Sequence, residues 1–382
     1  MAGKSDNDLK LIPTKVDEKN DGSNDTYDDY EDDYDGDDGK RGILYFFVPG
    51  LMGSQLELIS KNNKKKIIYP TPVVTLLNPS KRKDFFKKYM LNTELPIYGT
   101  KILESFMGYD IYGNFIKKLK KKAKSIGKNS KVILFPYDWR KNINFNVSEL
   151  HECIGHWSSR ILFRDCDIVL IGHSLGGVLL RILIETYDLA KKSLYYSRVS
   201  KVVLCATPLF GQRNYFHMFY NIVHANNPHD KDRNSLYFRS NVLLNNQEQL
   251  ELFSNFWHSL FILCRKENLL DFRLTLYNNP QKYNVRCLSI ENDSKIIESL
   301  AQINKPSTIK YIIVYNTKFE INQVDLFLPR IFGSDGILSY INSDIVKISN
   351  VYNATEIRDY TSVSHSRLLS DKHIVKKIMD NI

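Results

Sequence analysis

A serine lies at the centre of a short glycine-rich segment, Gly172-His173-Ser174-Leu175-Gly176. An apolar, β-branched run at residues 167–171 precedes it, and apolar residues with helical spacing follow over residues 178–185. Strand, tight turn and helix form the context of a nucleophile elbow, in which the serine projects from a strained turn. The alternative is an ordinary serine in a glycine-rich strand–helix loop. The flanking segments favour the elbow, so we predict Ser174 to be a nucleophile.

A serine hydroxyl needs a base, usually histidine, and an acid that orients this base. In folds with such an elbow the order is serine, acid and histidine, each on a loop after a strand. His365 lies in a polar loop after the last predicted strand, whereas His373 lies inside the final predicted helix, so we predict His365 to be the base. His173 is expected to point away from the site, because neighbouring side chains on such a turn diverge. The remaining histidines are interpreted as structural or surface groups.

The acid is sought after a late strand, and Asp335 has the right context. It lies in the segment Gly333-Ser334-Asp335-Gly336, whose glycines allow a tight turn. Asp325 lacks the turn context, and Asp344 lies where the last predicted strand begins. A surface aspartate is the alternative interpretation, because Asp-Gly is a common turn pair. We predict Asp335 to be the orienting acid.

Acyl transfer also needs N–H donors for the negative oxygen that develops in the transition state. One is expected from the backbone of Leu175, the residue after the predicted nucleophile, and the other from a loop after an early strand. The segment Pro49–Gly53 is that loop, and its Gly50 and Gly53 allow the backbone to approach a substrate closely. The chain therefore carries the parts of an acyl-transfer site in the expected order.

The elements that would position these residues are short apolar runs separated by helical patterns. Helices are predicted at residues 109–124 and 147–163, from the elbow to about Leu194, and at Lys372–Ile382. Continuously apolar strands indicate an α/β fold with a mostly parallel central sheet and helices on both faces. The predicted strands cover residues 43–50, 132–135, 167–171, 199–205, 311–315 and 345–352.

Two stretches interrupt this alternation within a domain predicted to span residues 43–382. Residues 57–108 are expected to be irregular, because four prolines interrupt any long helix. Residues 212–281 are rich in aromatic residues and asparagine, with a helix predicted over Gln247–Cys264. This second insertion has the size of a cap or lid that would select the substrate.

The net charge of +10 is distributed unevenly along the chain. Residues 1–42 hold 14 acidic and 6 basic residues, which leaves a net charge of +18 on the remainder. An acidic segment with few apolar residues cannot offset its ordering entropy, so we predict a disordered tail, with an autoinhibitory arm as the alternative. A basic body favours an anionic partner such as a membrane surface. No lysine cluster has the form of a nucleic-acid-binding module, so no nucleic-acid partner is expected.

The five cysteines show no CxxC pair and no metal-ligand spacing with histidine, so we expect neither a metal nor another cofactor. Nothing in their number requires disulfides. No amino-terminal apolar segment indicates a signal peptide, and no apolar run is long enough to predict a membrane-spanning helix. The chain is therefore expected to be cytoplasmic or peripherally bound to a membrane.

Several sequence blocks together resemble the lecithin:cholesterol acyltransferase-like family of α/β-hydrolases. The order of the blocks is that of the family from residue 43 to residue 382, and the first three in combination are specific. The blocks are Val48–Glu57, Phe135–Arg140, Gly172–Gly177, Ala206–Gly211, Tyr311–Thr317 with Ser334–Ile337, and His365 before Leu368-Leu369.

This resemblance implies an α/β-hydrolase fold with an inserted cap, and a lipid-acyl serine esterase of the phospholipase, lipase or acyltransferase kind. It implies Ser174 as nucleophile, Asp335 as orienter and His365 as base. It further implies that the N–H groups of Met52 and Leu175 form the oxyanion hole. Asp138 and Arg140 belong to a block that is structural in the family, so we interpret them, like Gly50 and Gly53, as supporting residues.

The leading hypothesis is a serine enzyme that hydrolyses or transfers an acyl chain of a membrane phospholipid or other acyl lipid. Peripheral contact with an anionic membrane surface would accompany it. One alternative is an esterase of small soluble or protein-linked acyl esters. Another is a catalytically degenerate hydrolase that binds lipid as a scaffold, against which the ordered Ser174, Asp335 and His365 argue.

Overall fold

The computed structural model describes residues 41–71, 81, 84–90, 92–106, 108–208, 309–316, 354–359 and 365–382. All of them lie in one compact unit, Asp38–Ile382. The acidic tail before residue 41, the predicted cap and the loop around Asp335 lie outside the described residues, as do Asp325 and Asp344. The predicted boundaries of tail, domain and cap stay predictions.

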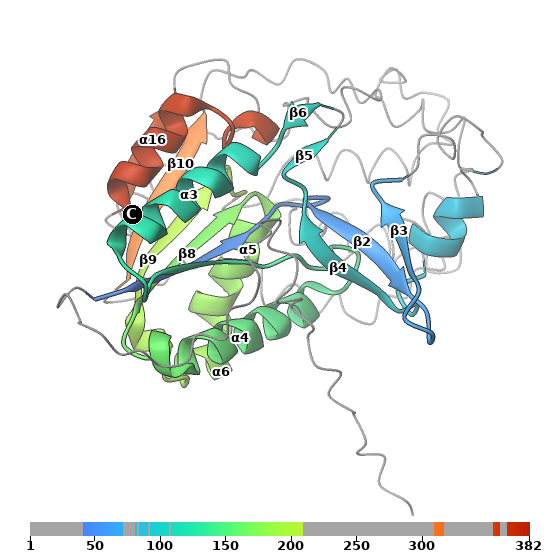
Figure 1. The fold of residues 1–382 in the computed structure, drawn as a ribbon, viewed down its shortest axis with the longest axis horizontal. Helices are drawn as coiled ribbons and strands as arrows, with labels where there is room; N and C mark the ends of the chain where they lie inside the picture. The colour runs from blue at the N-terminus through green and yellow to red at the C-terminus, as the bar shows by residue number, and fades with distance from the viewer. Residues whose placement is uncertain are drawn as a thin grey trace, which may run out of the picture. The chain divides into compact units, whose positions relative to one another are not determined.

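A parallel sheet is the centre of the described structure (Figure 1). Within the described residues it has six strands in the order β11-β10-β9-β8-β1-β7, and every neighbouring pair is parallel. Its inner strands are mostly apolar and buried because both faces of the sheet are covered. The strands are β1 (Ile43–Val48), β7 (Lys131–Leu134), β8 (Asp167–His173), β9 (Val199–Cys205), β10 (Lys310–Asn316) and β11 (Thr355–Asp359).

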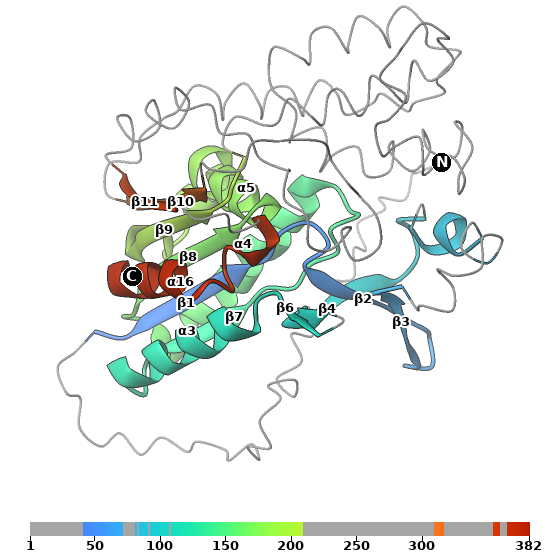
Figure 2. The ribbon, with the colours of Figure 1, turned by 90° about the horizontal axis from the view of Figure 1, so that it is seen from above.

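Helices pack on both faces of this sheet, as Figure 2 shows. α3 (Gly113–Ile126) and α16 (Lys372–Asn381) pack on one face, where their apolar residues join those of β1 in one core cluster. α4 (Ile143–Ser159) and α5 (Leu175–Arg181) contribute to a second core cluster on the opposite face. The strand order and the two helix layers confirm the predicted α/β-hydrolase fold.

The order of the strands places two loops side by side. After β1 the chain adds β7 on one side of β1, and then β8 on its other side. Val48, the last residue of β1, therefore pairs with Gly172 near the end of β8. Binding sites of open parallel sheets form at such a switch point, beyond the carboxyl ends of the strands. The loop after β1 and the turn at Ser174 both begin there.

The stretch predicted to be irregular contains a second sheet, so that prediction is wrong. β2 (Ser54–Ile59), β3 (Lys65–Tyr69) and β4 (Ile97–Ile102) form an antiparallel sheet in the order β3-β2-β4. Leu56, Ile68 and Ile97 are fully buried, which gives each of these strands an apolar anchor. The strands are short, β3 and β4 carry exposed lysines, and prolines lie between them, so the sequence shows no clear alternation of apolar and polar residues. Shorter elements nearby are η1 (Phe86–Met90), β5 (Ser105–Phe106) and β6 (Tyr109–Asp110).

The elbow helix is shorter than predicted. α5 continues as the π-helical turn η3 (Ile182–Thr186) and ends at Tyr187, which has extended φ and ψ of −88° and 99°. Tyr187 turns toward α4, where its ring meets the His151 ring edge-on with centroids 5.5 Å apart. This tertiary contact interrupts the continuous helix that apolar spacing predicted. The chain resumes as α6 (Asp188–Lys191) and η4 (Tyr196–Arg198), while η2 (Ile161–Phe163) follows α4.

The carboxyl-terminal helix agrees with the prediction. α16 covers the predicted closing helix, with Asp371 accepting hydrogen bonds from the first N–H groups of the helix. The strand predicted at residues 345–352 lies outside the described residues. The last strand that the structure describes is β11, which begins at Thr355. β11 lies at an edge of the sheet, and its Thr-Glu-Ile-Arg-Asp sequence lacks the continuous apolar run of an inner strand.

Candidate active site

Ser174 adopts the backbone conformation that a nucleophile elbow requires. Its φ and ψ are 51° and −121°, a region that non-glycine residues occupy at a cost of about 1–3 kcal/mol. The Ser174 N–H donates to the carbonyl of Cys205 at 2.8 Å, and its own carbonyl accepts from Gly177 N–H at 3.0 Å. These two bonds fix the turn between β8 and α5. The strain is thus held by the neighbouring strand and by the first turn of the helix.

The loop after β1 lies directly against this elbow. A Cβ atom at Gly176 would lie 2.3 Å from the Val48 carbonyl oxygen, so no side chain fits between the elbow and the end of β1. A Cβ atom at Gly50 would lie 3.0 Å from Ser174 Cβ and 3.1 Å from His173 Nδ1. Gly50 and Gly176 therefore permit the close approach of these two backbones, whereas the sequence predicted for Gly50 only a close approach to a substrate.

The loop itself is a tight turn. Gly53 N–H donates to the Gly50 carbonyl at 2.9 Å, with Met52 at a φ of 60°. Gly50 N–H donates to the Tyr112 hydroxyl at 3.1 Å. Among the described residues, the N–H groups of Leu51 and Met52 have no hydrogen-bond acceptor. They are the two donors of this loop that are available to an oxyanion, alongside Leu175 N–H at the start of α5.

His173 lies beside His365 in the structure. The two rings have centroids 4.9 Å apart. His173 Nδ1 lies 2.8 Å from the Tyr112 hydroxyl, and its Nε2 lies 3.1 Å from the His365 carbonyl oxygen. Burial lowers the pKa of His173 to about 4, so the ring is neutral at physiological pH. Partners distant in sequence, Tyr112 and the His365 carbonyl, therefore hold the ring.

His365 lies in η6 (His365–Arg367), between the last strand and α16, as its predicted loop position requires. Its Nδ1 atom is buried and has no hydrogen-bond partner among the residues that the structure describes. Burial lowers the pKa of His365 well below its ordinary value, and the adjacent His173 lowers it further. A carboxylate at Nδ1 would oppose both effects and would orient the ring. Asp335, the predicted acid, lies outside the described residues, so its role stays a prediction.

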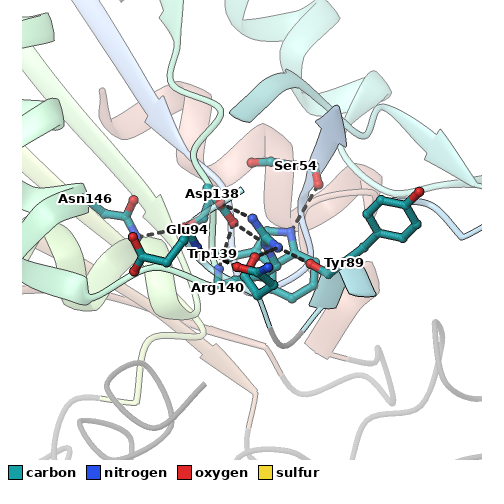
Figure 3. Close-up of polar contacts among 8 residues, drawn as sticks. Ser54, Tyr89, Glu94, Asp138, Trp139, Arg140 and Asn146 are labelled. Atoms are coloured by element: carbon teal, nitrogen blue, oxygen red, sulfur yellow. Dashed lines mark hydrogen bonds and ion pairs between the residues drawn. The ribbon is translucent and has the colours of Figure 1, made fainter. Parts of the chain in front are cut away.

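Asp138 and Arg140 form a buried ion pair (Figure 3). Arg140 Nε donates to Asp138 Oδ1 at 2.9 Å and Nη2 donates to Oδ2 at 2.6 Å. Arg140 Nη1 also donates to the carbonyl oxygens of Tyr89 and Asn92, in the insertion that carries the antiparallel sheet. The pair thus attaches this insertion to the main sheet. It lies in the block interpreted as supporting from the sequence.

The neighbouring residues of the same block hold the loop after β1. Tyr137 donates its hydroxyl proton to the Pro49 carbonyl at 3.1 Å, next to Gly50. Tyr137 N–H donates to Ser54 Oγ at 3.1 Å, and Trp139 Nε1 donates to the Ser54 carbonyl at 3.2 Å. The sequence block at residues 135–140 therefore fixes both ends of the Gly50–Gly53 turn.

The comparisons with known proteins agree with this arrangement. Residues 98–221 match the family model of lecithin:cholesterol acyltransferase. The match contains the Asp138–Arg140 block and the Ser174 elbow, and it confirms the predicted resemblance to this family over that stretch. The match and the fold support an acyl hydrolase or acyltransferase of the α/β-hydrolase type. No curated protein sequence gives a significant match to the chain.

Solved structures that resemble the chain include the Tle4-Tli4 complex, a lipase and a carboxyl esterase. The Tle4-Tli4 complex has a TM-score of 0.44 at 11% identity, covering 72% of this chain and 75% of the other. Lipase BlEst2 of Bacillus licheniformis gives 0.38 at 13%, covering 90% and 92%. The metagenomic carboxyl esterase MGS0156 gives 0.35 at 15%, covering 85% and 65%. These scores are low, so the fold assignment rests on the strand order and the helix layers of the chain itself.

Sequence reasoning missed Tyr112, Leu51 and the position of His173. Tyr112 precedes α3 in a stretch predicted to be helical from residue 109, so nothing marked it as a partner of the site. Leu51 and Met52 are the two central residues of the Gly50–Gly53 turn. The sequence alone does not show that the N–H group of Leu51 is also available. The described residues contain no cluster of three or more metal-binding side chains, and no helix among them is long and apolar enough to span a membrane.

We predict that Arg140→Met lowers the free energy of unfolding by about 3–5 kcal/mol, because it leaves the buried Asp138 carboxylate without its cation. Urea denaturation measures this loss. Lys376→Met is the matched control, since the Lys376–Asp380 pair is exposed and contributes at most about 1 kcal/mol. An Arg140→Met protein as stable as the Lys376→Met protein would contradict this assignment.

Stability should fall as the pH drops from about 6.5 to about 4. The pKa of His173 is about 4 in the folded chain against 6.5 as its ordinary value, so the unfolded chain binds more protons in this window. The groups facing His173 are Tyr112, His365 and Cys205, none of them a carboxylate. The expected loss from His173 is about 3 kcal/mol at the acid end.

His173→Gln isolates this contribution from the other titrating groups. Urea midpoints measured across this pH range should fall less steeply for His173→Gln than for the wild type. His373→Gln is the control, because it makes the same substitution at an exposed histidine of α16. Equal slopes for the wild type and His173→Gln would show that His173 is not buried in its neutral form.

Proposed function

We propose that the chain is a serine-dependent enzyme that hydrolyses or transfers the acyl chain of a membrane lipid, such as a phospholipid. The observation that carries the proposal is the strained turn at Ser174, at the end of β8 and against the loop after β1. Such a turn exposes a serine hydroxyl at the edge of the sheet. The family match at residues 98–221 supports the acyl chemistry and a lipid as its substrate.

In the proposed reaction, Ser174 Oγ attacks the carbonyl carbon of the acyl ester while His365 accepts the hydroxyl proton. The negative oxygen that develops is bound by Leu175 N–H and by Met52 N–H, with Leu51 N–H as the other available donor of the loop. Collapse breaks the ester bond, and the leaving alcohol takes the proton from His365. Water or an acceptor alcohol then attacks the acyl-enzyme, with His365 acting first as base and then as acid.

Asp335 is proposed to orient His365 through the Nδ1 atom. The support from the described residues is that this buried nitrogen has no partner among them. A neutral imidazole must present Nε2 as the acceptor toward the nucleophile, which places its proton on Nδ1. A carboxylate there fixes the tautomer and stabilises the imidazolium that forms during the reaction.

Covalent labelling tests the nucleophile. A fluorophosphonate probe should label the wild type, and Ser174→Ala should abolish the label. His365→Ala should slow labelling at least about 1000-fold, because the base is lost. Ser159→Ala is the control, since Ser159 is an exposed serine and should not affect labelling. A wild type that fails to label even in the presence of phospholipid vesicles would contradict the proposed function.

A basic surface supports the membrane part of the proposal. α3 and α16 are neighbours, joined by the bond from Lys122 Nζ to the Met379 carbonyl at 2.6 Å. Both helices bury their apolar side and expose lysines. Each basic residue near an anionic bilayer contributes about 1 kcal/mol. The exposed lysines are Lys117, Lys121, Lys124, Lys372, Lys376 and Lys377.

Reversal of charge on this surface should weaken binding to phosphatidylserine-containing vesicles at least about tenfold. The variant is Lys117→Glu with Lys121→Glu, and Lys61→Glu with Lys64→Glu is the control with the same change of net charge at exposed positions. Vesicle sedimentation measures binding, and mass spectrometry of the lipids separates fatty acid plus lysolipid from a newly formed ester. Equal binding by both variants would contradict a membrane-facing role of α3.

A further inference from the structure

A chain of three hydrogen bonds crosses the described part of the site. Gly50 N–H donates to the Tyr112 hydroxyl at 3.1 Å, and Tyr112 lies 2.8 Å from His173 Nδ1. His173 Nε2 lies 3.1 Å from the His365 carbonyl oxygen. The chain thus begins in the loop that holds the proposed oxyanion donors and ends at the residue proposed as the base.

Only one arrangement of protons satisfies every member of this chain. The His365 carbonyl can only accept, so His173 Nε2 carries the proton, and Nδ1 of the neutral ring is then an acceptor. Tyr112 therefore donates to Nδ1, and its oxygen accepts from Gly50 N–H. All bonds run in the same direction, and such buried chains polarise one another cooperatively.

The surroundings stabilise this arrangement. Burial lowers the pKa of His173 to about 4 and raises the pKa of Tyr112 above its ordinary value, so one ring stays neutral and one hydroxyl stays protonated. The Tyr112 ring meets the Phe47 ring edge-on with centroids 5.2 Å apart. A Cβ atom at Gly53 would lie 3.1 Å from the Tyr112 hydroxyl, so the turn encloses this group closely.

We propose that Tyr112 and His173 are positioning residues. They hold the loop after β1, with its proposed oxyanion donors, and the segment that contains His365 in place relative to Ser174. The proposal rests on the proposed function and extends it to residues that touch no reacting atom. Gly50 directly precedes Leu51 and Met52, so an anchor at its N–H sets where their donors point. The His365 carbonyl belongs to the same residue as the base, so an anchor there restrains the ring. Ser174 follows His173 directly in the chain.

Tyr112→Phe is the variant that tests this proposal, because it removes one hydroxyl and keeps the ring that packs against Phe47. Tyr45→Phe is its matched control. Tyr45 lies in β1, in the same core cluster, and its buried hydroxyl has no hydrogen-bond partner in the described part of the chain. Both changes remove the same atom from a similar environment, so a difference between them reports the hydrogen-bond chain.

Turnover of p-nitrophenyl butyrate and the rate of fluorophosphonate labelling are the kinetic readouts, with thermal unfolding as a check of folding. Tyr112→Phe should lower kcat by about 10- to 100-fold with KM within about twofold of the wild type, because misplaced groups slow the chemical step. Tyr45→Phe should leave both parameters unchanged. The double variant His173→Gln with Tyr112→Phe should lose no more kcat than the less active of the two single variants, because both changes break the same hydrogen-bond chain.

Nitrogen-15 NMR of histidine in the wild type reads the chain without reference to activity. His173, assigned by its loss in His173→Gln, should show the neutral tautomer with the proton on Nε2, and its Nδ1 shift should change in Tyr112→Phe. A Tyr112→Phe kcat within twofold of the wild type, multiplicative losses in the double variant, or the opposite tautomer would overturn the proposal. Absence of labelling at Ser174 in the wild type would instead refute the proposed function, and the NMR result would then stand alone.

Discussion

The close approach of two backbones at the carboxyl ends of β1 and β8 is the constraint on which the site depends. Gly176, in the first turn of α5, lies so near the Val48 carbonyl that a methyl group would meet it at 2.3 Å. Gly50 lies against Ser174 in the same way, and the serine occupies its strained conformation there. A cost of about 1–3 kcal/mol is sustained there because β8 and α5 are buried on every side. A serine exposed on a fixed turn follows from this geometry.

The segments around the elbow are held by polar contacts over long distances in the sequence. The Asp138–Arg140 pair attaches the antiparallel sheet, and Tyr137 and Trp139 fix the two ends of the turn after β1. On the other side, Tyr112 and His173 connect that turn with His365. Buried donors and acceptors without partners are costly, so these contacts restrict each loop to one position. The rigid sheet supplies the platform, and these side chains supply the alignment.

The sequence predicts the inner part of this structure well, for a physical reason. Strands buried on both faces are continuous apolar runs, and β9 begins and ends at the predicted residues. The antiparallel sheet at residues 54–102 was not predicted. Its strands are short and only partly apolar, and lysines and prolines lie in and between them. The edge strand β11 has one apolar residue among its five, Ile357, and carries little signal for the same reason.

Some residues of the candidate site could likewise be predicted from the sequence, and others could not. Motif order indicates Ser174 and His365, because each must follow a particular strand, and the structure describes both at those places. The orientation of His173 could not be predicted, because it depends on Tyr112 and on the His365 carbonyl, 61 and 192 positions away in the chain. Local rules about a turn do not contain such partners. Tyr112 has no sequence signature at all, and its role emerges only from the packed arrangement of four segments.

If Ser174 is the nucleophile, it carries an acyl group during the reaction, and mass spectrometry of a tryptic peptide can detect this group. The protein is mixed briefly with phospholipid vesicles, quenched in acid and digested with trypsin, which cleaves after Arg164 and Arg181. The peptide from Asp165 to Arg181 should gain the mass of one fatty acyl group in place of a hydrogen, with the modification on Ser174. Lipid consumed while this peptide stays unmodified, or an acyl group found on another residue, would contradict the assignment of Ser174 as the nucleophile.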